Sequence, residues 1–140
     1  MRITCETVLN GGLVLLVSFL GVHLNAQITD QVNADISHPF IVSTKTLPAG
    51  KYVFRMQEGN NTIMTVTSAD GKDSDTFIVR ESIAKATPAH TELVFNRYGD
   101  KEFLKNVYEG GNKMGVRVVE TSKVEKQLVA QGQQPVTHTE

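Results

Sequence analysis

Cysteine is nearly missing from this sequence, and tryptophan is missing altogether. The 140 residues contain one cysteine, Cys5, and no tryptophan. Cys5 falls in a segment that we expect to be removed, so the remaining chain has no disulfide and no catalytic thiol. An excess of one charge is also lacking, because 14 Lys+Arg against 15 Asp+Glu leave a formal net charge of −1. Nucleic-acid binding needs a concentrated cationic surface, and this balance argues against it.

A hydrophobic run long enough to cross a membrane is missing as well. The longest apolar run, residues 11–22, has about 12 residues, whereas a bilayer core of about 30 Å takes about 20 helical residues. Arg2 precedes the run and the small residue Ala26 follows it, which is typical of a secretory signal peptide. We therefore expect residues 1–26 to be cleaved and the protein to be exported, periplasmic or extracellular, with no transmembrane segment in the mature chain. An uncut membrane anchor is the alternative.

The chain after the signal is rich in valine and threonine, whose branched side chains suit a β-sheet. Turn-forming sequences recur about every 11 residues, which is typical of an antiparallel barrel or sandwich. We expect one mainly β domain over residues 27–130, an antiparallel barrel of about seven strands, with a two-sheet sandwich as the alternative. Besides the two hairpins below, the expected strands are Val32–Ser37, Phe40–Thr44, Asp75–Glu81 and Met114–Val119.

The first predicted hairpin turns at residues 59–61. With this turn, Phe54 lies opposite Val66 and Met56 lies opposite Met64, so one face of the hairpin is wholly apolar. A slip of one residue would place threonines against Phe54 and Met56, and this penalty fixes the register.

The second predicted hairpin turns at Gly99-Asp100. Here Phe95 lies opposite Leu104, and Arg97 lies opposite Glu102 as a cross-strand ion pair. Such a pair contributes about 0.2–1 kcal/mol.

One short helix is predicted near the end of the chain. Ser122 and Glu125 have the spacing of a capping box, and Val124 and Leu128 would form the buried stripe of the helix. Residues 131–140 show no core-forming pattern, so we expect a flexible tail.

Catalytic and metal-binding patterns are absent from the sequence. His38, His90 and His138 stand singly, without the spacing of metal ligands, so we expect no metal site and no cofactor. The acids between residues 70 and 75 fit turn chemistry. The sequence also lacks a Gly-x-Ser-x-Gly motif, a phosphate-binding loop and a dinucleotide fingerprint. We therefore expect a protein that is not an enzyme.

A polar-aromatic stretch at the second hairpin is the candidate binding site. It comprises Arg97, Tyr98 and Asp100, with Tyr108 on the partner strand. Arginine and tyrosine are common at binding hot spots. The alternative is a hairpin with an ion pair and a surface tyrosine.

Several segments, taken in order, resemble a family of small secreted bacterial β-proteins. The resemblance lies in residues 38–42, in Leu-Pro-Ala-Gly-Lys-Tyr at 47–52, in residues 93–107 and in residues 122–128. His38 departs from the pattern, because an apolar residue is expected there. The family has no established activity, so the resemblance implies a secreted β-domain and no catalytic residue.

Together these features favour an exported, non-enzymatic β-domain that binds or scaffolds a partner at the cell envelope or outside the cell. The sequence does not identify the partner, and an envelope or extracellular protein and a small ligand are both open alternatives. A barrel that carries a small apolar ligand is the alternative, and a hydrolase is the third hypothesis. The residues that test the carrier hypothesis are Phe54, Met56, Met64, Phe77 and Phe95. A large cavity lined by them would support a carrier, and a core packed solid by the same side chains would argue against it.

Overall fold

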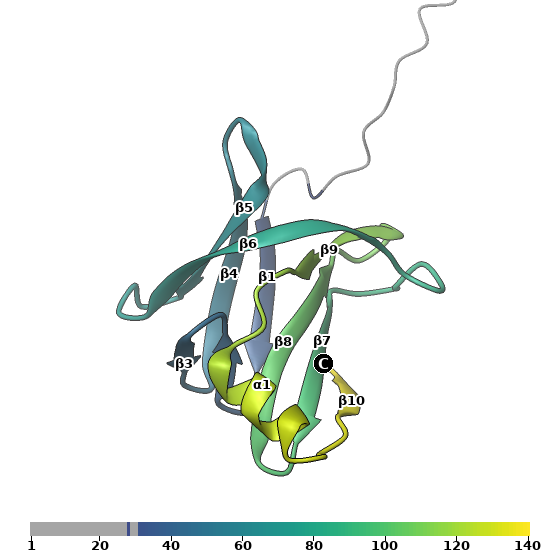
Figure 1. Cartoon of the computed structure of the whole chain (residues 1–140). Helices are drawn as coiled ribbons and strands as arrows, with labels where there is room; N and C mark the ends of the chain where they lie inside the picture. Colours follow the sequence, from purple (N-terminus) through teal and green to yellow (C-terminus); the bar gives the residue numbers. More distant parts are fainter. Residues whose placement is uncertain (1–27, 29–30) are drawn as a thin grey trace, which may run out of the picture.

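The computed structural model describes Ile28 and residues 31–140, so the expected signal peptide lies outside the described residues. The fold is mainly β with one short helix (Figure 1). Its strands are β1 (Gln31–Ile36), β2 (Phe40–Val42), β3 (Lys45–Leu47), β4 (Gly50–Gln57), β5 (Asn60–Ser68), β6 (Ser74–Ile83), β7 (Glu92–Tyr98), β8 (Lys101–Tyr108), β9 (Met114–Val118) and β10 (Val136–Thr139). The helix is α1 (Lys123–Ala130). Within the described part of the chain, no helix has the length and apolarity to span a membrane.

The strands form one curved, mostly antiparallel sheet that does not close into a barrel. The main path runs β1-β4-β5-β6-β9-β8-β2-β3, and β7 pairs with both β8 and β10. Among the described strands, the only parallel pairing joins β2 and β8, at Ile41 and Phe103. The expectation of a closed or nearly closed barrel of about seven strands is therefore corrected to an unclosed sheet of ten strands. Among the described strands, β8 pairs with β2 as well as with β7 and β9, and β1 pairs with β4 alone, so the sheet does not close.

The Glu140 side chain links the segment after β1 to the segment after β10. Ser37 follows β1, and its backbone N–H donates a hydrogen bond to the Glu140 carboxylate beyond β10, at 3.3 Å. The Ser37 hydroxyl donates to the same carboxylate. We call this contact the Ser37–Glu140 seam. It connects two positions that are 103 residues apart in the sequence.

Both predicted hairpin registers are confirmed. Phe54 pairs with Val66 and Met56 with Met64, and the cross-strand pairs of the second hairpin are also as expected. The first hairpin departs from expectation only at its tip, where a bulge pairs Gln57 with Asn60. Alternating apolar residues therefore set the register along the strands, while the turn adjusts locally.

The interior of the curved sheet is filled by aromatic and branched side chains. Phe40 lies at its centre, fully buried, with its ring edge-on to Tyr52 and to Phe95 at centroid distances of 5.1 and 6.0 Å. Among the five residues named for the carrier hypothesis, four are at most 2% exposed, and Met56 is partly buried against the same cluster. The cavity that Met56 lines has a volume of about 10 Å³, which is about the space of one water molecule.

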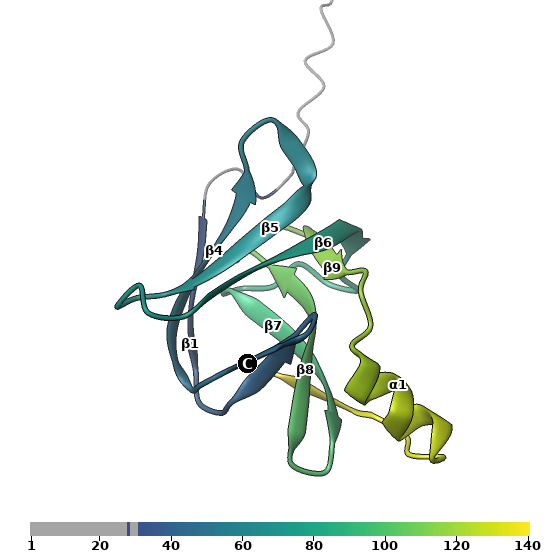
Figure 2. The ribbon, with the colours of Figure 1, turned by 60° about the vertical axis from the view of Figure 1, so that its left-hand side comes forward.

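Helix α1 begins as predicted but docks differently. The Ser122 hydroxyl accepts a hydrogen bond from the Glu125 amide at 3.0 Å, which confirms the cap. The predicted buried stripe is wrong, because Val124 is 41% exposed and Glu125 is the buried residue. Glu125 accepts hydrogen bonds from Asn96 and Tyr98, so polar contacts connect the helix to β7. Figure 2 shows α1 outside the curved sheet.

The C-terminal segment also differs from expectation, because part of the predicted flexible tail is a strand. Val136–Thr139 forms β10, which pairs antiparallel with β7. The backbone of Glu140 extends this pairing, since it exchanges hydrogen bonds with Leu93 at 2.7 and 3.0 Å. Val136-Thr-His-Thr139 does carry β-branched residues, but the preceding Gln-Gly-Gln-Gln-Pro stretch obscured this signal in the sequence.

Candidate metal centre

The four predicted binding residues do not share one surface. In the register of the second hairpin, Tyr98 pairs with Lys101 next to the turn, whereas Tyr108 pairs with Glu92 at the far end of the strands. Asp100 is exposed in the turn. The side chain of Arg97 is 47% exposed, and its Nε lies 3.9 Å from Glu102 Oε1.

The two tyrosines are buried and have structural partners. Tyr98 packs edge-on against Phe103, and its hydroxyl donates to Glu125 at 3.3 Å. Burial, together with the nearby negative charge of Glu125, raises the pKa of Tyr98 above its usual value. The Tyr108 hydroxyl lies 3.0 Å from the hydroxyl of Ser82 and accepts a hydrogen bond from Asn106 at 3.2 Å. Neither ring is therefore the exposed contact residue that the sequence suggested.

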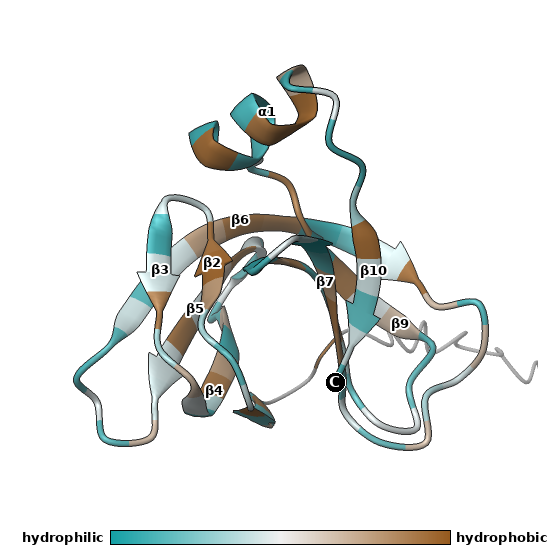
Figure 3. Cartoon of the chain, turned by 90° about the horizontal axis from the view of Figure 1, so that it is seen from below, coloured by the Kyte–Doolittle hydropathy of each residue, from teal (hydrophilic) through white to brown (hydrophobic). Residues whose placement is uncertain are grey.

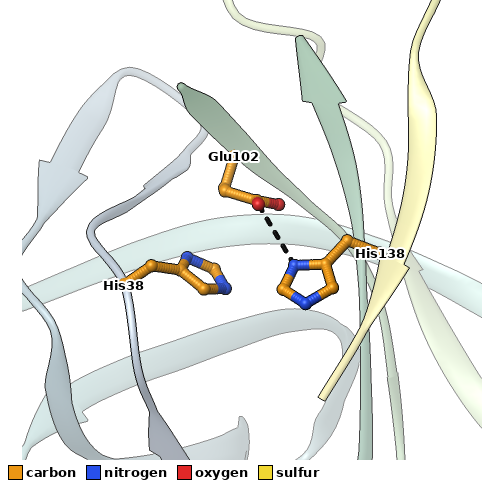
Figure 4. A group of neighbouring side chains, drawn as sticks. All are labelled: His38, Glu102 and His138. Atoms are coloured by element: carbon orange, nitrogen blue, oxygen red, sulfur yellow. Dashed lines mark hydrogen bonds and ion pairs between the residues drawn. The ribbon is translucent and has the colours of Figure 1, made fainter. Parts of the chain in front are cut away.

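The fold instead brings together three ligand-type side chains from distant parts of the sequence. His38 lies in the link between β1 and β2, Glu102 near the start of β8, and His138 in β10. Figure 4 shows the three side chains converging, with the carboxylate of Glu102 next to the ring of His138. One potential ligand atom of each residue lies within 4.8 Å of the others.

Strand register places two of these side chains on the same face of the sheet. His138 pairs with Phe95, and Arg97, two residues further along β7, pairs with Glu102. Side chains two residues apart point to the same side of a strand, and Phe95 points into the core. His138 and Glu102 therefore lie on the inner face, at the end of the sheet where the seam is found. Figure 3 views the chain from below, with the end of β10 beside β7.

The ring of His38 is held by one nitrogen, and its other nitrogen makes no hydrogen bond among the described residues. Its Nδ1 lies 3.2 Å from the Pro39 carbonyl oxygen, to which an Nδ1–H donates. That tautomer leaves a lone pair on Nε2, which is the usual arrangement of a metal-binding histidine. Nε2 is buried without a hydrogen-bond partner and lies 3.4 Å from Glu140 Oε2, while the ring packs edge-on against Phe95.

Only one of the two oxygens of the Glu102 carboxylate has a hydrogen-bond partner among the described residues. Glu102 is 5% exposed, and its Oε1 lies 3.1 Å from His138 Nδ1. Its other oxygen, Oε2, is buried and has no hydrogen-bond partner among the described residues. Leaving a buried polar atom unpaired costs about 1–3 kcal/mol, and more when the group is charged. Two such atoms in one cluster indicate a site suited to a further partner.

The donor set matches a borderline transition-metal ion. Zn²⁺ binds histidine nitrogen and carboxylate oxygen at about 2.0–2.2 Å, which sets the ligand atoms of a tetrahedral shell about 3.3 Å apart. The present spacing, up to 4.8 Å, requires side-chain movements of about 1 Å to close on such an ion. Two histidines and one carboxylate would leave a fourth position open, and the Glu140 carboxylate lies beside His38.

The sequence predicted no metal site because its ligand-type residues lack the close spacing of metal ligands. These three residues are brought together by β10 and by the bend at Pro39, neither of which can be detected from ligand spacing. His90, the third histidine named from the sequence, is exposed and lies outside the cluster. No family model, curated protein or solved structure matches the chain. The resemblance to secreted bacterial β-proteins therefore stays a prediction.

Proposed function

We propose that this protein is an exported, non-enzymatic β-domain that binds one divalent transition-metal ion, with Zn²⁺ as the reference ion. His38, Glu102 and His138 would be its ligands. The observation that carries the proposal is that His38 Nε2 and Glu102 Oε2 are buried without a hydrogen bond among the described residues, in a group of three residues that each offer a ligand atom within 4.8 Å of the others. Export is supported by the predicted signal peptide.

A purely structural role for the cluster accounts for only part of these contacts. The contact of Glu102 with His138 would anchor β10 on the sheet, and it uses Oε1 and Nδ1. It leaves Glu102 Oε2 without a hydrogen bond, and the only charged partner of His38 Nε2 among the described residues is the Glu140 carboxylate, at 3.4 Å. A bound cation would give the buried Glu102 Oε2 a partner.

The apolar carrier has less support. Phe54, Met64, Phe77 and Phe95 belong to one packed cluster, and the cavity beside Met56 has a volume of about 10 Å³. Sites for small molecules usually have volumes of about 300–1,000 Å³.

Titration of the purified protein with Zn²⁺ by isothermal calorimetry tests the metal site. We expect one ion per chain, and a loss of affinity of at least about tenfold in His38→Gln, Glu102→Gln and His138→Gln. Zn²⁺ at about 100 times its Kd would stabilise the fold by about 2.7 kcal/mol, and a chelator would reverse this. His90→Gln is the matched control and should bind as the unaltered protein does. Absence of binding, or an equal loss in His90→Gln, would contradict the proposal.

Export is tested separately by sequencing the N-terminus of the secreted protein. We expect it to begin at Gln27 or within a residue or two. Recovery of an intact, membrane-held N-terminus would overturn the localisation but leave the metal site open to its own test.

A further inference from the structure

A second polar site lies on the outer face of the sheet, under the segment that leads into α1. It is a cleft of about 260 Å³, and among its lining residues are Arg80 on β6, Arg117 on β9 and Lys105 on β8. Asn96 and Thr121 contribute uncharged polar groups. The cleft shares none of its lining residues with the candidate metal centre.

The two arginines are cross-strand neighbours on one face of the sheet. Arg80 and Arg117 are cross-strand partners in the pairing of β6 with β9. Like charges in this position destabilise a sheet, so the pair calls for a compensating anion. No ion pair of Arg80, Arg117 or Lys105 is found among the described residues.

The acids that line the cleft are already engaged elsewhere. Glu125 is buried and accepts hydrogen bonds from Asn96 and Tyr98. Glu120 accepts one from the Ser43 hydroxyl at 2.7 Å. Neither carboxylate comes within 4.0 Å of an arginine nitrogen, so the charge of the guanidinium groups is not compensated by contact.

We propose that this cleft binds a phosphate group, free or as part of a small monoester or lipid headgroup, between Arg80 and Arg117. A guanidinium is a planar fork that matches two phosphate oxygens, and two facing forks can hold one group from both sides. Lys105, which also lines the cleft, adds a third positive charge. The volume of about 260 Å³ limits the ligand to a small group rather than a polymer.

Binding of inorganic phosphate to the purified protein, followed by the NMR signals of the arginine Nε–H groups, tests the proposal. Phosphate should shift the signals of Arg80 and Arg117 in a saturable way. Arg80→Gln and Arg117→Gln should each weaken binding at least tenfold, and Arg80→Lys should recover part of the affinity. Arg55→Gln is the matched control, because Arg55 is an exposed strand arginine on β4 and hydrogen-bonds to Gln31. It should bind phosphate normally.

Two further measurements keep the result clear. Without phosphate, the thermal midpoint of Arg80→Gln should not fall, since the substitution relieves repulsion with Arg117; a lower midpoint would contradict uncompensated charge. Glycerol phosphate and vesicles with or without phosphatidic acid distinguish the sources: competition by the monoester supports a soluble ligand, and binding only to phosphatidic acid vesicles supports a headgroup. Absence of binding to all three probes, or an equal loss in Arg55→Gln, would overturn the proposal.

Discussion

In both the β4–β5 and the β7–β8 hairpin, alternating apolar residues set the register, but the two hairpins differ in where they place buried polar groups. In β4–β5, the inward residues Phe54, Met64 and Val66 are apolar, and threonines occupy the other face. In β7–β8, buried polar groups lie on both faces, with Glu102 inside and Asn106 and Tyr98 outside. The first hairpin serves mainly to form the core. The second also positions the candidate metal ligands Glu102 and, through β10, His138, and it holds the helix.

The comparison shows which features of a hairpin its sequence pattern predicts and which it does not. The alternation of apolar residues fixes the register of both hairpins. It does not tell which partner a buried polar residue such as Glu102 or Tyr98 will meet, because those partners come from β10 and α1. Each prediction below therefore changes one hairpin or its neighbours and leaves the other intact.

The largest effect is expected in the core of the first hairpin. Phe54→Ala removes a fully buried ring and should lower the free energy of unfolding by about 4 kcal/mol. Arg55→Ala, on the exposed face of the same strand, should cost less than about 0.5 kcal/mol. Urea denaturation of both variants measures the difference. Similar losses in the two variants would mean that the inner and outer faces are assigned wrongly.

A nearly equal effect is expected next to the second hairpin, at Gly115. A Cβ there would lie 2.2 Å from the Tyr108 ring and 2.5 Å from the Val107 carbonyl oxygen. The carbonyl belongs to the β8 ladder and cannot move freely, so Gly115→Ala should cost about 3 kcal/mol.

Gly71→Ala is the control for this experiment. No atom lies within 4 Å of its added Cβ, and only its φ of +74° opposes a side chain, so about 1 kcal/mol is expected. Thermal or urea unfolding compares the two. A cost for Gly115→Ala no larger than for Gly71→Ala would contradict the close packing of Tyr108 on β9.

A smaller effect is expected where β7 holds α1. Tyr98→Phe removes the hydroxyl that donates to Glu125, and it should cost about 1 kcal/mol near neutral pH. The pKa of Tyr98 is raised in the folded protein, so its contribution is complete below pH about 10 and is lost as the pH rises through the folded value.

The pH dependence of unfolding therefore checks the assignment. Between pH 9 and pH 11 the stability of the unaltered protein should fall, and that of Tyr98→Phe should fall less steeply. Tyr52, whose pKa is raised mainly by burial, contributes to the slope in both proteins. Identical slopes would show that Tyr98 does not titrate in the folded state in this way.

The smallest effect is expected at the cross-strand ion pair of the second hairpin. Arg97 is half-exposed and 3.9 Å from Glu102, so Arg97→Ala should cost about 0.2–1 kcal/mol. A double-mutant cycle with Glu102→Gln should give a coupling energy in the same range. A binding partner lost in Arg97→Ala with unchanged stability would instead restore Arg97 as a contact residue.

Much of the sheet could be predicted because its information is local. The pairs Phe54–Val66 and Arg97–Glu102 follow from the alternation and from the turn between two neighbouring segments. The cap of α1 is equally local, since Ser122 and Glu125 are three residues apart. These features need no knowledge of distant chain segments.

The candidate metal centre could not be predicted for the opposite reason. His38 and His138 meet only because β10 adds to β7 and because the chain bends at Pro39 after β1. The burial of Glu125 in place of Val124 has a similar cause, because Asn96 and Tyr98 offer hydrogen-bond donors at the docking position of α1. A local sequence pattern predicts neither the meeting of the two histidines nor the docking of α1 through Glu125.

The Ser37–Glu140 seam has a consequence for the order of folding. Contacts between residues 103 apart in sequence form late, since closing so long a loop must come before the contact is gained. The sheet from β1 to β9 can assemble while β10 is still unbound, and the cluster of His38, Glu102 and His138 is complete only when β10 has paired. A stopped-flow measurement with a metal indicator would then report the last step of folding rather than the first.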